Sequence, residues 1–274
     1  MYPVVLTIAG SDPSGGAGIQ ADLKTFMAYE VYGTAVITAV TAQNTRGVRA
    51  VNPLPPEWVR EQLVAVLEDL PPLAIKLGLL PTPACIQVVA ETLSAYGYDS
   101  SLTSVPVIVD PVGVASSGHL LAEPGCPELL KEIILPQTTL VTPNLPELFF
   151  LTGRSFTLST DFQPEVIAAG KSLLGSGVKA VLAKGGHGGG EWSIDILISA
   201  QGIKDFRSRR IWTQHGHGTG CTLSAAIAAG LARGWPLEKA IKKAKRYVTR
   251  ALANALALGD GSGPLDHRCG WKDI

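Results

Sequence analysis

Residues 4–26, VVLTIAGSDPSGGAGIQADLKTF, decide the fold of this 274-residue chain. The segment Val4–Ala9 is apolar and β-branched and has the length of a buried strand. A glycine-rich loop, Gly10–Gly18, follows it and leads into a helix that we expect to begin near Ile19. A strand, a tight turn and a helix in this order form the first part of a βαβ unit, which brings parallel strands together in one sheet.

The same alternation continues through most of the chain. The segments of strand length are nearly continuous apolar runs, as expected for a sheet that is covered on both faces. A helix is predicted over Pro56–Leu70, where apolar residues recur at three- and four-residue spacing and make one stripe that can pack on the sheet. The predicted parallel strands are Val4–Ala9, Thr34–Val40, Leu73–Leu77, Val105–Val109, Leu140–Thr142 and Lys179–Ala183.

The last third of the chain changes character. Three short strand-like segments separated by polar bends predict an antiparallel edge, at Ile194–Ser199, Ile203–Phe206 and Arg209–Trp212. Two helices then follow, Thr219–Ala232 and Pro236 to about Leu258. The sequence therefore predicts an α/β fold with a mostly parallel sheet, flanking helices and a small antiparallel edge.

Composition excludes several classes of function. Lysine and arginine number 23 and aspartate and glutamate 23, so the formal net charge is zero and no nucleic-acid partner is expected. No apolar stretch approaches the roughly 18 residues needed to cross a bilayer, so no membrane association is expected. The first lysine is Lys24, no secretory leader is expected, and we predict a cytoplasmic protein. Four scattered cysteines without a CxxC motif are expected to be free thiols.

Ligands of an open parallel sheet bind at the carboxyl ends of its strands, so the residues that follow each strand are the candidate site. Gly16–Ala21 fits the GxGxxG/A pattern of dinucleotide-binding proteins, which leaves a nicotinamide-dependent oxidoreductase as a remote alternative. That pattern needs an acidic residue after the second strand, where this chain has Thr41–Thr45. The segment Gly170–Ser172 does not complete a phosphate-binding P-loop, because Glu165 stands where the first glycine is required.

The segment His217–Thr222, HGTGCT, precedes a helix of small residues and predicts a phosphate site. Consecutive small residues at a helix start can aim several N–H groups at one anion, and the helix dipole adds a favourable potential. The same potential is expected to lower the pKa of Cys221 and to make it a base or nucleophile. A buried, inert thiol in a tight turn is the alternative, and a metal site of His215, His217 and Cys221 is a further one that lacks a fourth ligand.

Three more strand ends carry polar side chains. Asp110 follows one strand, Asn144 and Glu147 follow the next, and Lys184 follows a third. Carboxylates with an amide suit hydrated Mg²⁺, and a lysine flanked by glycines suits a polyphosphate, so together they predict a triphosphate site. Taken singly, each could be a turn, a helix start or a surface residue. The basic residues of the last helix are expected to form a solvated face: Lys239, Lys242, Lys243, Lys245, Arg246 and Arg250.

These motifs occur together in one known family. The chain resembles the hydroxymethylpyrimidine/phosphomethylpyrimidine kinases of thiamin biosynthesis, within the ribokinase-like superfamily, over nearly its whole length. The segments that carry the resemblance are Ile8–Phe26, Thr41–Thr45, Val109–Val112, Thr142–Glu147, Lys184–His187 and His217–Thr222. It implies one doubly wound, ribokinase-like kinase domain over residues 1–274, a homodimer, ATP and Mg²⁺ as cofactors, and a small pyrimidine substrate that is phosphorylated twice, to the monophosphate and the diphosphate.

The resemblance also implies a role for each motif. Asp22 and Gln43 would hold the pyrimidine, with Gly10 and Val112 nearby. Gly218, Thr219 and Gly220 would form an anion hole for the transferred phosphoryl group, and Cys221 would be the base. Asp110 and Glu147, with Asn144, would organise Mg²⁺ mostly through water. Lys184, Asn144 and Thr142 would bind ATP.

The chain also departs from the family pattern at several positions. Leu79, Gly113 and Ser116 stand where other residues are frequent and are expected to reshape the pyrimidine pocket. His215 and Gly216 replace an asparagine and a small hydroxyl residue, which puts a nucleotide contact from these positions in doubt. A pyridoxal or pyridoxine kinase of the same subgroup is the main alternative, since its substrate is also a flat ring with a hydroxymethyl group. A ligand sensor without catalysis is a third.

Overall fold

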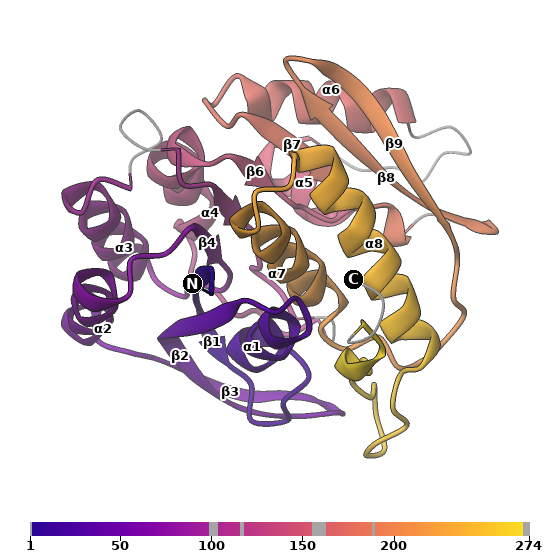
Figure 1. The fold of residues 1–274 in the computed structure, drawn as a ribbon, viewed down its shortest axis with the longest axis horizontal. Coiled ribbons are helices and arrows are strands. Elements are labelled where there is room, and N and C mark those ends of the chain that lie inside the picture. Colours follow the sequence, from indigo (N-terminus) through magenta and orange to yellow (C-terminus); the bar gives the residue numbers. More distant parts are fainter. Residues whose placement is uncertain (1, 99–103, 116–117, 155–162, 188–189, 271–274) are drawn as a thin grey trace.

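The computed structural model describes residues 2–98, 104–115, 118–154, 163–187 and 190–270. They form one nine-stranded sheet in the order β3-β2-β1-β4-β5-β6-β7-β8-β9 (Figure 1). The inner strands β2, β1, β4, β5, β6 and β7 are parallel, and β3, β8 and β9 pair antiparallel with their neighbours. The predicted α/β fold is confirmed, with an antiparallel strand at both edges instead of one.

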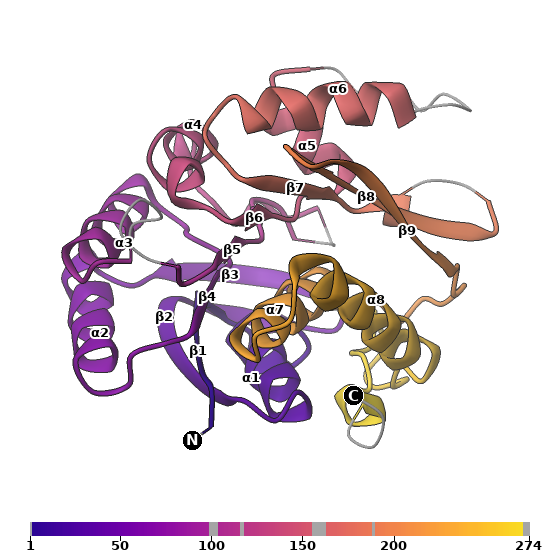
Figure 2. The same cartoon turned by 45° about the horizontal axis from the view of Figure 1, so that its top comes forward.

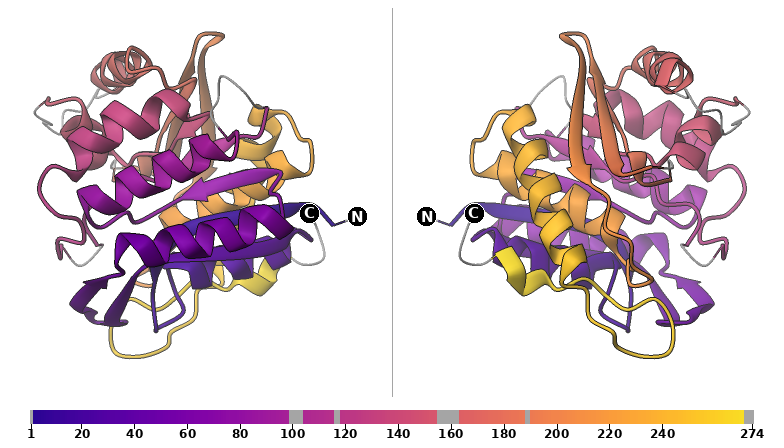
Figure 3. Two further views of the ribbon diagram at one scale, coloured as in Figure 1. Left: turned by 90° about the vertical axis from the view of Figure 1, so that its left-hand side faces the viewer. Right: turned by 90° about the vertical axis from the view of Figure 1, so that its right-hand side faces the viewer.

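The six predicted parallel strands all occur, with small differences at their ends. Each inner strand is an apolar run because helices cover the sheet on both sides (Figure 3). The strands are β1 Val4–Ser11, β2 Tyr32–Asn44, β3 Gly47–Pro53, β4 Ala74–Leu77, β5 Val107–Val109, β6 Leu140–Val141, β7 Ala180–Ala183, β8 Trp192–Ser199 and β9 Gly202–Arg209.

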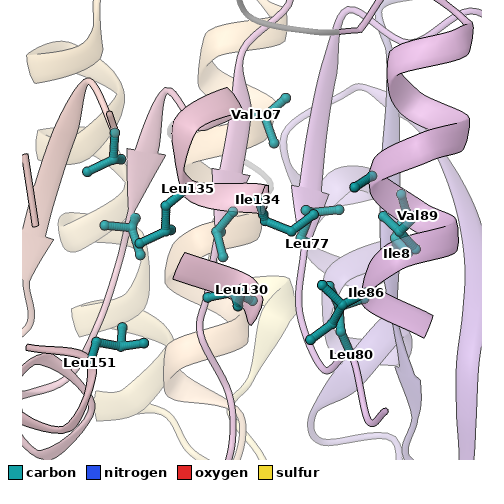
Figure 4. Close-up of a cluster of buried hydrophobic side chains, with 14 of the residues drawn as sticks. Ile8, Leu77, Leu80, Ile86, Val89, Val107, Leu130, Ile134, Leu135 and Leu151 are labelled. Atoms are coloured by element: carbon teal, nitrogen blue, oxygen red, sulfur yellow. The ribbon is translucent and has the colours of Figure 1, made fainter. Parts of the chain in front are cut away.

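The helices lie in two layers, with α1, α7 and α8 on one face of the sheet and α2 to α6 on the other (Figure 2). Each layer has its own hydrophobic core. In the second layer, Ile8 and Leu77 of the sheet belong to the same cluster as Val89 and Leu135 (Figure 4). The helices are α1 Gly18–Ala28, α2 Pro56–Asp69, α3 Pro83–Ala95, α4 Cys126–Leu129, α5 Leu145–Leu151, α6 Gln163–Leu174, α7 Thr219–Ala232 and α8 Leu237–Ala253.

Helix α7 is the central helix of its layer. It contacts α1 and α8 on its sides and the strands β1, β4 and β5 beneath it. Its residues Ala225, Ala226, Ala228 and Ala229 are fully buried, because short side chains let the helix axis approach three neighbours at once. The start of α7 therefore lies deep at the carboxyl edge of the sheet, where the sequence predicted the phosphate site. Within the described residues, no helix is long and apolar enough to cross a membrane.

Three predicted boundaries are wrong. The bend predicted at Arg207–Ser208 is part of β9, which pairs without interruption with β8. The strand predicted over Arg209–Trp212 is not formed, since β9 ends at Arg209. The Arg210 guanidinium donates instead to the carbonyls of Gly185, Gly186 and Gly190. The last helix ends at Ala253, and not near Leu258. The hairpin strand β3 was not predicted from the sequence.

The segment after α8 returns to the start of α7. His217 forms an isolated parallel bridge with Pro264, and the Nε2 atom of His267 lies 3.0 Å from the Thr222 hydroxyl. The His267 side chain is buried. Burial lowers the pKa of His267 to about 4 from its ordinary 6.5, and the charge of Lys24 acts in the same direction.

His267 makes stability depend on pH. As pH falls from 6.5 to about 4, the unfolded chain gains a proton that the folded protein does not, so the free energy of unfolding falls in this window. We expect His267→Gln to remove about 3 kcal/mol of this loss between pH 7 and pH 4, as measured by urea unfolding. The exposed His119→Gln is the control and should follow the wild type. An unchanged pH dependence in His267→Gln would contradict the prediction.

Candidate active site

A cavity of about 1220 Å³ lies at the carboxyl ends of the parallel strands. Its wall brings together segments that are far apart in the sequence, as an open parallel sheet requires. Eleven of the predicted site residues line it: Gly10, Gln43, Asp110, Val112, Asn144, Glu147, Lys184, Gly218, Thr219, Gly220 and Cys221.

Two predicted residues, Thr142 and Asp22, are absent from the wall. Thr142 is buried, and its hydroxyl donates to the Val109 carbonyl and lies 3.3 Å from Asp110 Oδ1, so it supports Asp110 from below. Asp22 is also fully buried and does not line the cavity, so its position does not allow the predicted direct contact with the pyrimidine.

Asp22 is instead half of a buried ion pair. Lys76 Nζ lies 2.8 Å from Asp22 Oδ2, and the Thr7 hydroxyl donates to the same oxygen at 2.6 Å. Burial raises the pKa of Asp22, and the Lys76 charge opposes that shift. Lys76 lines the cavity floor beside Gly78, so Asp22 influences the cavity through this lysine.

Sequence reasoning missed Lys76 as a site residue. Lys76 is the third residue of β4 and is buried on all sides, although a lysine is almost never fully buried without a partner. The sequence does hold a signal for Lys76, because it is a charged residue inside the apolar run Leu73–Leu77.

The predicted anion hole begins at Gly218, the N-cap of α7. Its φ of +86° is the left-handed conformation that favours glycine. A Cβ atom at this position would lie 1.8 Å from the Gly16 carbonyl oxygen, so only glycine allows the two turns to touch. The first N–H groups of α7 have no partner within the helix, and Gly218–Cys221 line the cavity, so these groups lie where an anion could bind. The Thr219 N–H donates to the Gly216 carbonyl at 3.3 Å and would have to exchange this bond for one to the anion.

Lys184 and Asp110 lie next to this helix start. Lys184 Nζ is 2.7 Å from Asp110 Oδ1 and 3.9 Å from Glu147 Oε2, and a Cβ on Gly220 would lie 3.1 Å from the same Nζ. Burial opposes the charge of Lys184, but the two carboxylates outweigh it and raise the pKa of the ammonium. Burial also raises the pKa of Glu147, against the Lys184 charge. A positive group is therefore held beside the helix start.

Asn144 and Glu147 have a structural role as well. The Asn144 side chain accepts from the Glu147 N–H at 2.9 Å, and the Glu147 carboxylate accepts from the Asn144 N–H at 2.7 Å. This capping box begins α5. The helix-start alternative is confirmed, and both residues line the cavity at the same time.

The donor set suits a hydrated divalent cation. No three His, Cys, Asp or Glu side chains gather as a direct metal cage in the described part of the chain. Asp110 Oδ2, however, is buried and has no hydrogen-bond partner among the described residues, and it lies near Gly220. One free carboxylate oxygen with Glu147 nearby fits Mg²⁺, which keeps several waters and takes few protein ligands.

The expected activation of Cys221 is wrong for this state of the protein. Burial raises the pKa of the Cys221 thiol to about 11, and the carboxylates of Asp110 and Asp22 add to the shift. The Lys76 charge acts against it. Desolvation therefore outweighs the Lys76 charge, and the thiol is protonated at neutral pH. All four cysteines are free, as predicted.

The basic face predicted on α8 is also partly wrong. Lys245 is buried and lines the cavity, with its Nζ 2.7 Å from Asp195 Oδ2. The other oxygen of Asp195 accepts from the Gly185 N–H at 3.0 Å. The pair therefore fixes the peptide that follows Lys184.

The departures from the family pattern have clear positions. Leu79 packs on Gly10, where a Cβ would lie 3.0 Å from Leu79 Cδ2. His215 Nδ1 accepts from the Gly263 N–H at 3.1 Å, and the Gly216 N–H donates to Ser262 Oγ. These two residues thus contact the segment after α8, and Gly216 also lines the cavity. Gly113 lines the cavity, and Ser116 lies outside the described residues.

Comparison with known proteins places this geometry in a family. The family model described as phosphomethylpyrimidine kinase matches residues 12–266. The chain belongs to the phosphomethylpyrimidine kinase family. It is 45% identical, over 100% of both chains, to a hydroxymethylpyrimidine/phosphomethylpyrimidine kinase of Rhizobium meliloti. As a member of this family it is a phosphotransferase, and membership decides against the nicotinamide-dependent oxidoreductase.

Solved structures agree with this family assignment and with the ribokinase-like fold. A phosphomethylpyrimidine kinase from Clostridium difficile superimposes with a TM-score of 0.78 at 40% identity, over 92% of this chain and 100% of that one. A pyridoxal kinase from Staphylococcus aureus in complex with AMP-PCP and pyridoxal superimposes with a TM-score of 0.86 at 33% identity, over 98% of this chain and 94% of that one. One of these solved structures therefore holds an ATP analogue together with pyridoxal.

The buried pair of Lys76 and Asp22 gives a stability prediction. Lys76→Met leaves the Asp22 carboxylate buried without a counter-charge, so we expect the free energy of unfolding to fall by about 3–5 kcal/mol. The double variant Asp22→Asn with Lys76→Met should recover most of the loss in urea unfolding. Lys204→Met, which removes the exposed ion pair with Glu238, should cost about 0.5 kcal/mol or less. A double variant no better than Lys76→Met would contradict this account.

The contact between Gly218 and Gly16 gives a catalytic prediction. Gly218→Ala forces the start of α7 away from the first turn, and we expect kcat to fall by about 10²–10³ because the N–H donors move. Gly234→Ala is a matched control, since Gly234 also has a positive φ of +76° but nothing lies within 4 Å of its Cβ position. Both variants should lose some stability, and only Gly218→Ala should lose activity. Equal kcat values in steady-state assays would refute the role of the contact.

Proposed function

We propose that this chain transfers the γ-phosphoryl group of ATP to the hydroxymethyl group of 4-amino-5-hydroxymethyl-2-methylpyrimidine and then to the resulting monophosphate, in thiamin biosynthesis. The observation that carries the proposal is one cavity that joins the start of α7, the Lys184 and Asp110 pair, and Gln43. The family and the relative at 45% identity support the same substrate.

Gln43 and the first turn would hold the ring. Gln43 lies at the end of β2, Gly10 lies near the end of β1 against Leu79, and both residues line the cavity. A carboxamide offers both a donor and an acceptor, which matches the edge of an aminopyrimidine. Val112 lines the same cavity and would contact the apolar face of the ring.

Phosphoryl transfer needs positioning and charge neutralisation more than covalent help. The N–H groups of Gly218, Thr219 and Gly220 would donate hydrogen bonds to the oxygens of the transferred phosphoryl group, and the Lys184 ammonium beside Gly220 would stabilise its charge. Asn144 would contact the nucleotide from the start of α5. Thr142 would act indirectly, through Asp110.

Cys221 would accept the proton of the substrate hydroxyl. Its raised pKa means that little thiolate exists at neutral pH, so its part in the rate is modest. Asp110 and Glu147 would hold Mg²⁺ mostly through water, and the ion supplies positive charge to the phosphates when bound. The homodimer, the single domain over residues 1–274 and the cytoplasmic location stay predictions.

Pyridoxal kinase is the second candidate. The Staphylococcus aureus pyridoxal kinase shares the fold over 98% of this chain, and its substrate is also a flat ring with a hydroxymethyl group. Gly113 carries no side chain on the cavity wall, and no atom lies within 4 Å of its Cβ position, which leaves room for a ring with one more substituent.

An assay that couples ADP release to absorbance tests the proposal. We expect turnover with the pyrimidine alcohol and with its monophosphate, and slower turnover with pyridoxal. Lys184→Met should reduce kcat by about 10²–10³, because it removes a positive charge from the phosphoryl site. Cys221→Ala should reduce kcat by about tenfold or less, because little of the thiol is ionised at neutral pH. Lys204→Met, an exposed lysine outside the cavity, is the control. Efficient use of pyridoxal with no use of the pyrimidine monophosphate would replace the first candidate by the second.

A further inference from the structure

His217 belongs to the HGTGCT motif but has no part in the chemistry proposed above. Its Nε2 atom lies 2.8 Å from Asp12 Oδ2 and 3.2 Å from the amide nitrogen of Gln43. These partners come from two other elements, the turn after β1 and the end of β2. One imidazole nitrogen thus contacts both Asp12 and Gln43, and His217 directly precedes Gly218, the first residue of the anion hole.

Asp12 organises the whole turn after β1. Its Oδ1 accepts from the Ser14 N–H at 2.9 Å, and its Oδ2 accepts from the N–H groups of Gly16 and Ala17 at 3.2 and 2.9 Å. Ala17 is the N-cap of α1. Burial alone would raise the pKa of Asp12, but hydrogen bonds from His217 and Ser14 hold it at about 2. The carboxylate is therefore ionised at neutral pH and can only accept hydrogen bonds.

The backbone leaves no room between the two turns. A Cβ on Gly16 would lie 2.5 Å from His217 Cδ2, and a Cβ on Gly218 would lie 1.8 Å from the Gly16 carbonyl oxygen. The Cδ2–Nε2 edge of the imidazole is therefore packed against the first turn while Nε2 is bonded to Asp12. A shift of either turn must move the other.

We propose that His217 is a positioning residue that, through Asp12, holds the turn after β1 and the anion hole at a constant spacing. This proposal rests on the proposed function, because it assigns the ring to the Gln43 side and the phosphoryl group to Gly218–Gly220. Transfer needs the hydroxymethyl oxygen and the phosphorus atom in contact, so the spacing of the two turns sets the rate.

The proton on His217 Nε2 also determines the orientation of Gln43. Because Asp12 carries no proton, the hydrogen atom between Asp12 Oδ2 and His217 Nε2 belongs to the imidazole. Nε2 then has no lone pair that could accept from the Gln43 NH₂ group. With its carboxamide turned by 180°, Gln43 points its oxygen to this N–H. Its NH₂ group then faces Thr41, whose hydroxyl donates to the Ser11 carbonyl at 3.0 Å and can accept in return.

Steady-state kinetics with the pyrimidine alcohol and Mg-ATP test the coupling. We expect His217→Ala and Asp12→Asn each to lower kcat/KM for the pyrimidine by roughly 10–100-fold, because small misplacements of reacting groups are costly. KM for ATP should change by about twofold or less. The double variant should fall no further than about threefold below the worse single variant, because both act through one contact. His217→Gln, whose amide N–H reaches the same place, should stay within about fivefold of the wild type.

Ser14→Ala is the matched control, since it removes a hydroxyl bond to Asp12 within the first turn and leaves the contact between the turns intact. We expect its kcat/KM to stay within about twofold of the wild type. Additive losses in the double variant would overturn the proposal. So would a loss in His217→Gln as large as in His217→Ala, because the imidazole would then act on the substrate itself.

Hydrogen exchange gives a readout that does not depend on activity. The amides of Gly16 and Ala17 are bonded to Asp12, so we expect them to exchange about tenfold faster or more in His217→Ala, and at the wild-type rate in His217→Gln. Unchanged exchange in His217→Ala would overturn the coupling. If the wild type failed to phosphorylate the pyrimidine, the proposed function would fall, and the exchange rates would still decide whether His217 holds the turn.

Discussion

The contact between two backbone turns, at Gly16 and Gly218, is the constraint on which the site depends. A Cβ atom on Gly218 would overlap the Gly16 carbonyl oxygen, so neither turn can move without the other. One turn ends the first strand and the other begins the most deeply buried helix, α7. Because α7 contacts β1, β4 and β5 through small side chains, the whole sheet determines where its free N–H groups point.

Buried ion pairs form the second feature of the site. Lys76 with Asp22, Lys184 with Asp110 and Lys245 with Asp195 each place an ammonium within 2.8 Å of a carboxylate near the cavity. Such pairs contribute little net stability, because desolvation offsets their attraction, so their value lies in fixing charge where a polyphosphate would bind. Burial, with the added effect of the Asp110 and Asp22 carboxylates, raises the pKa of the Cys221 thiol and keeps it protonated although the Lys76 ammonium lies near it.

Motifs at strand ends were well predicted, and their electrostatics were not. The parallel strands, the glycine-rich turn and the group of Asp110, Glu147 and Lys184 follow from apolar runs and from the topology of parallel sheets. The pKa of Cys221 was predicted in the wrong direction, because a local pattern shows the helix dipole and says nothing of burial. Lys245 was assigned to a solvated face, because helical spacing does not show which side the β8 strand covers.

By itself, the sequence determined the alternation of strands and helices, the family and the candidate site residues, all but Thr142 and Asp22 of which line the cavity. Apolar periodicity and turn glycines act over a few neighbouring residues, so the sequence shows them directly. Only the tertiary structure decided which buried charges pair and which loops touch. The Asp22 to Lys76 and Asp12 to His217 contacts join residues 54 and 205 positions apart. Desolvation depends on every element packed around a group, and such contacts leave no periodic pattern along the chain.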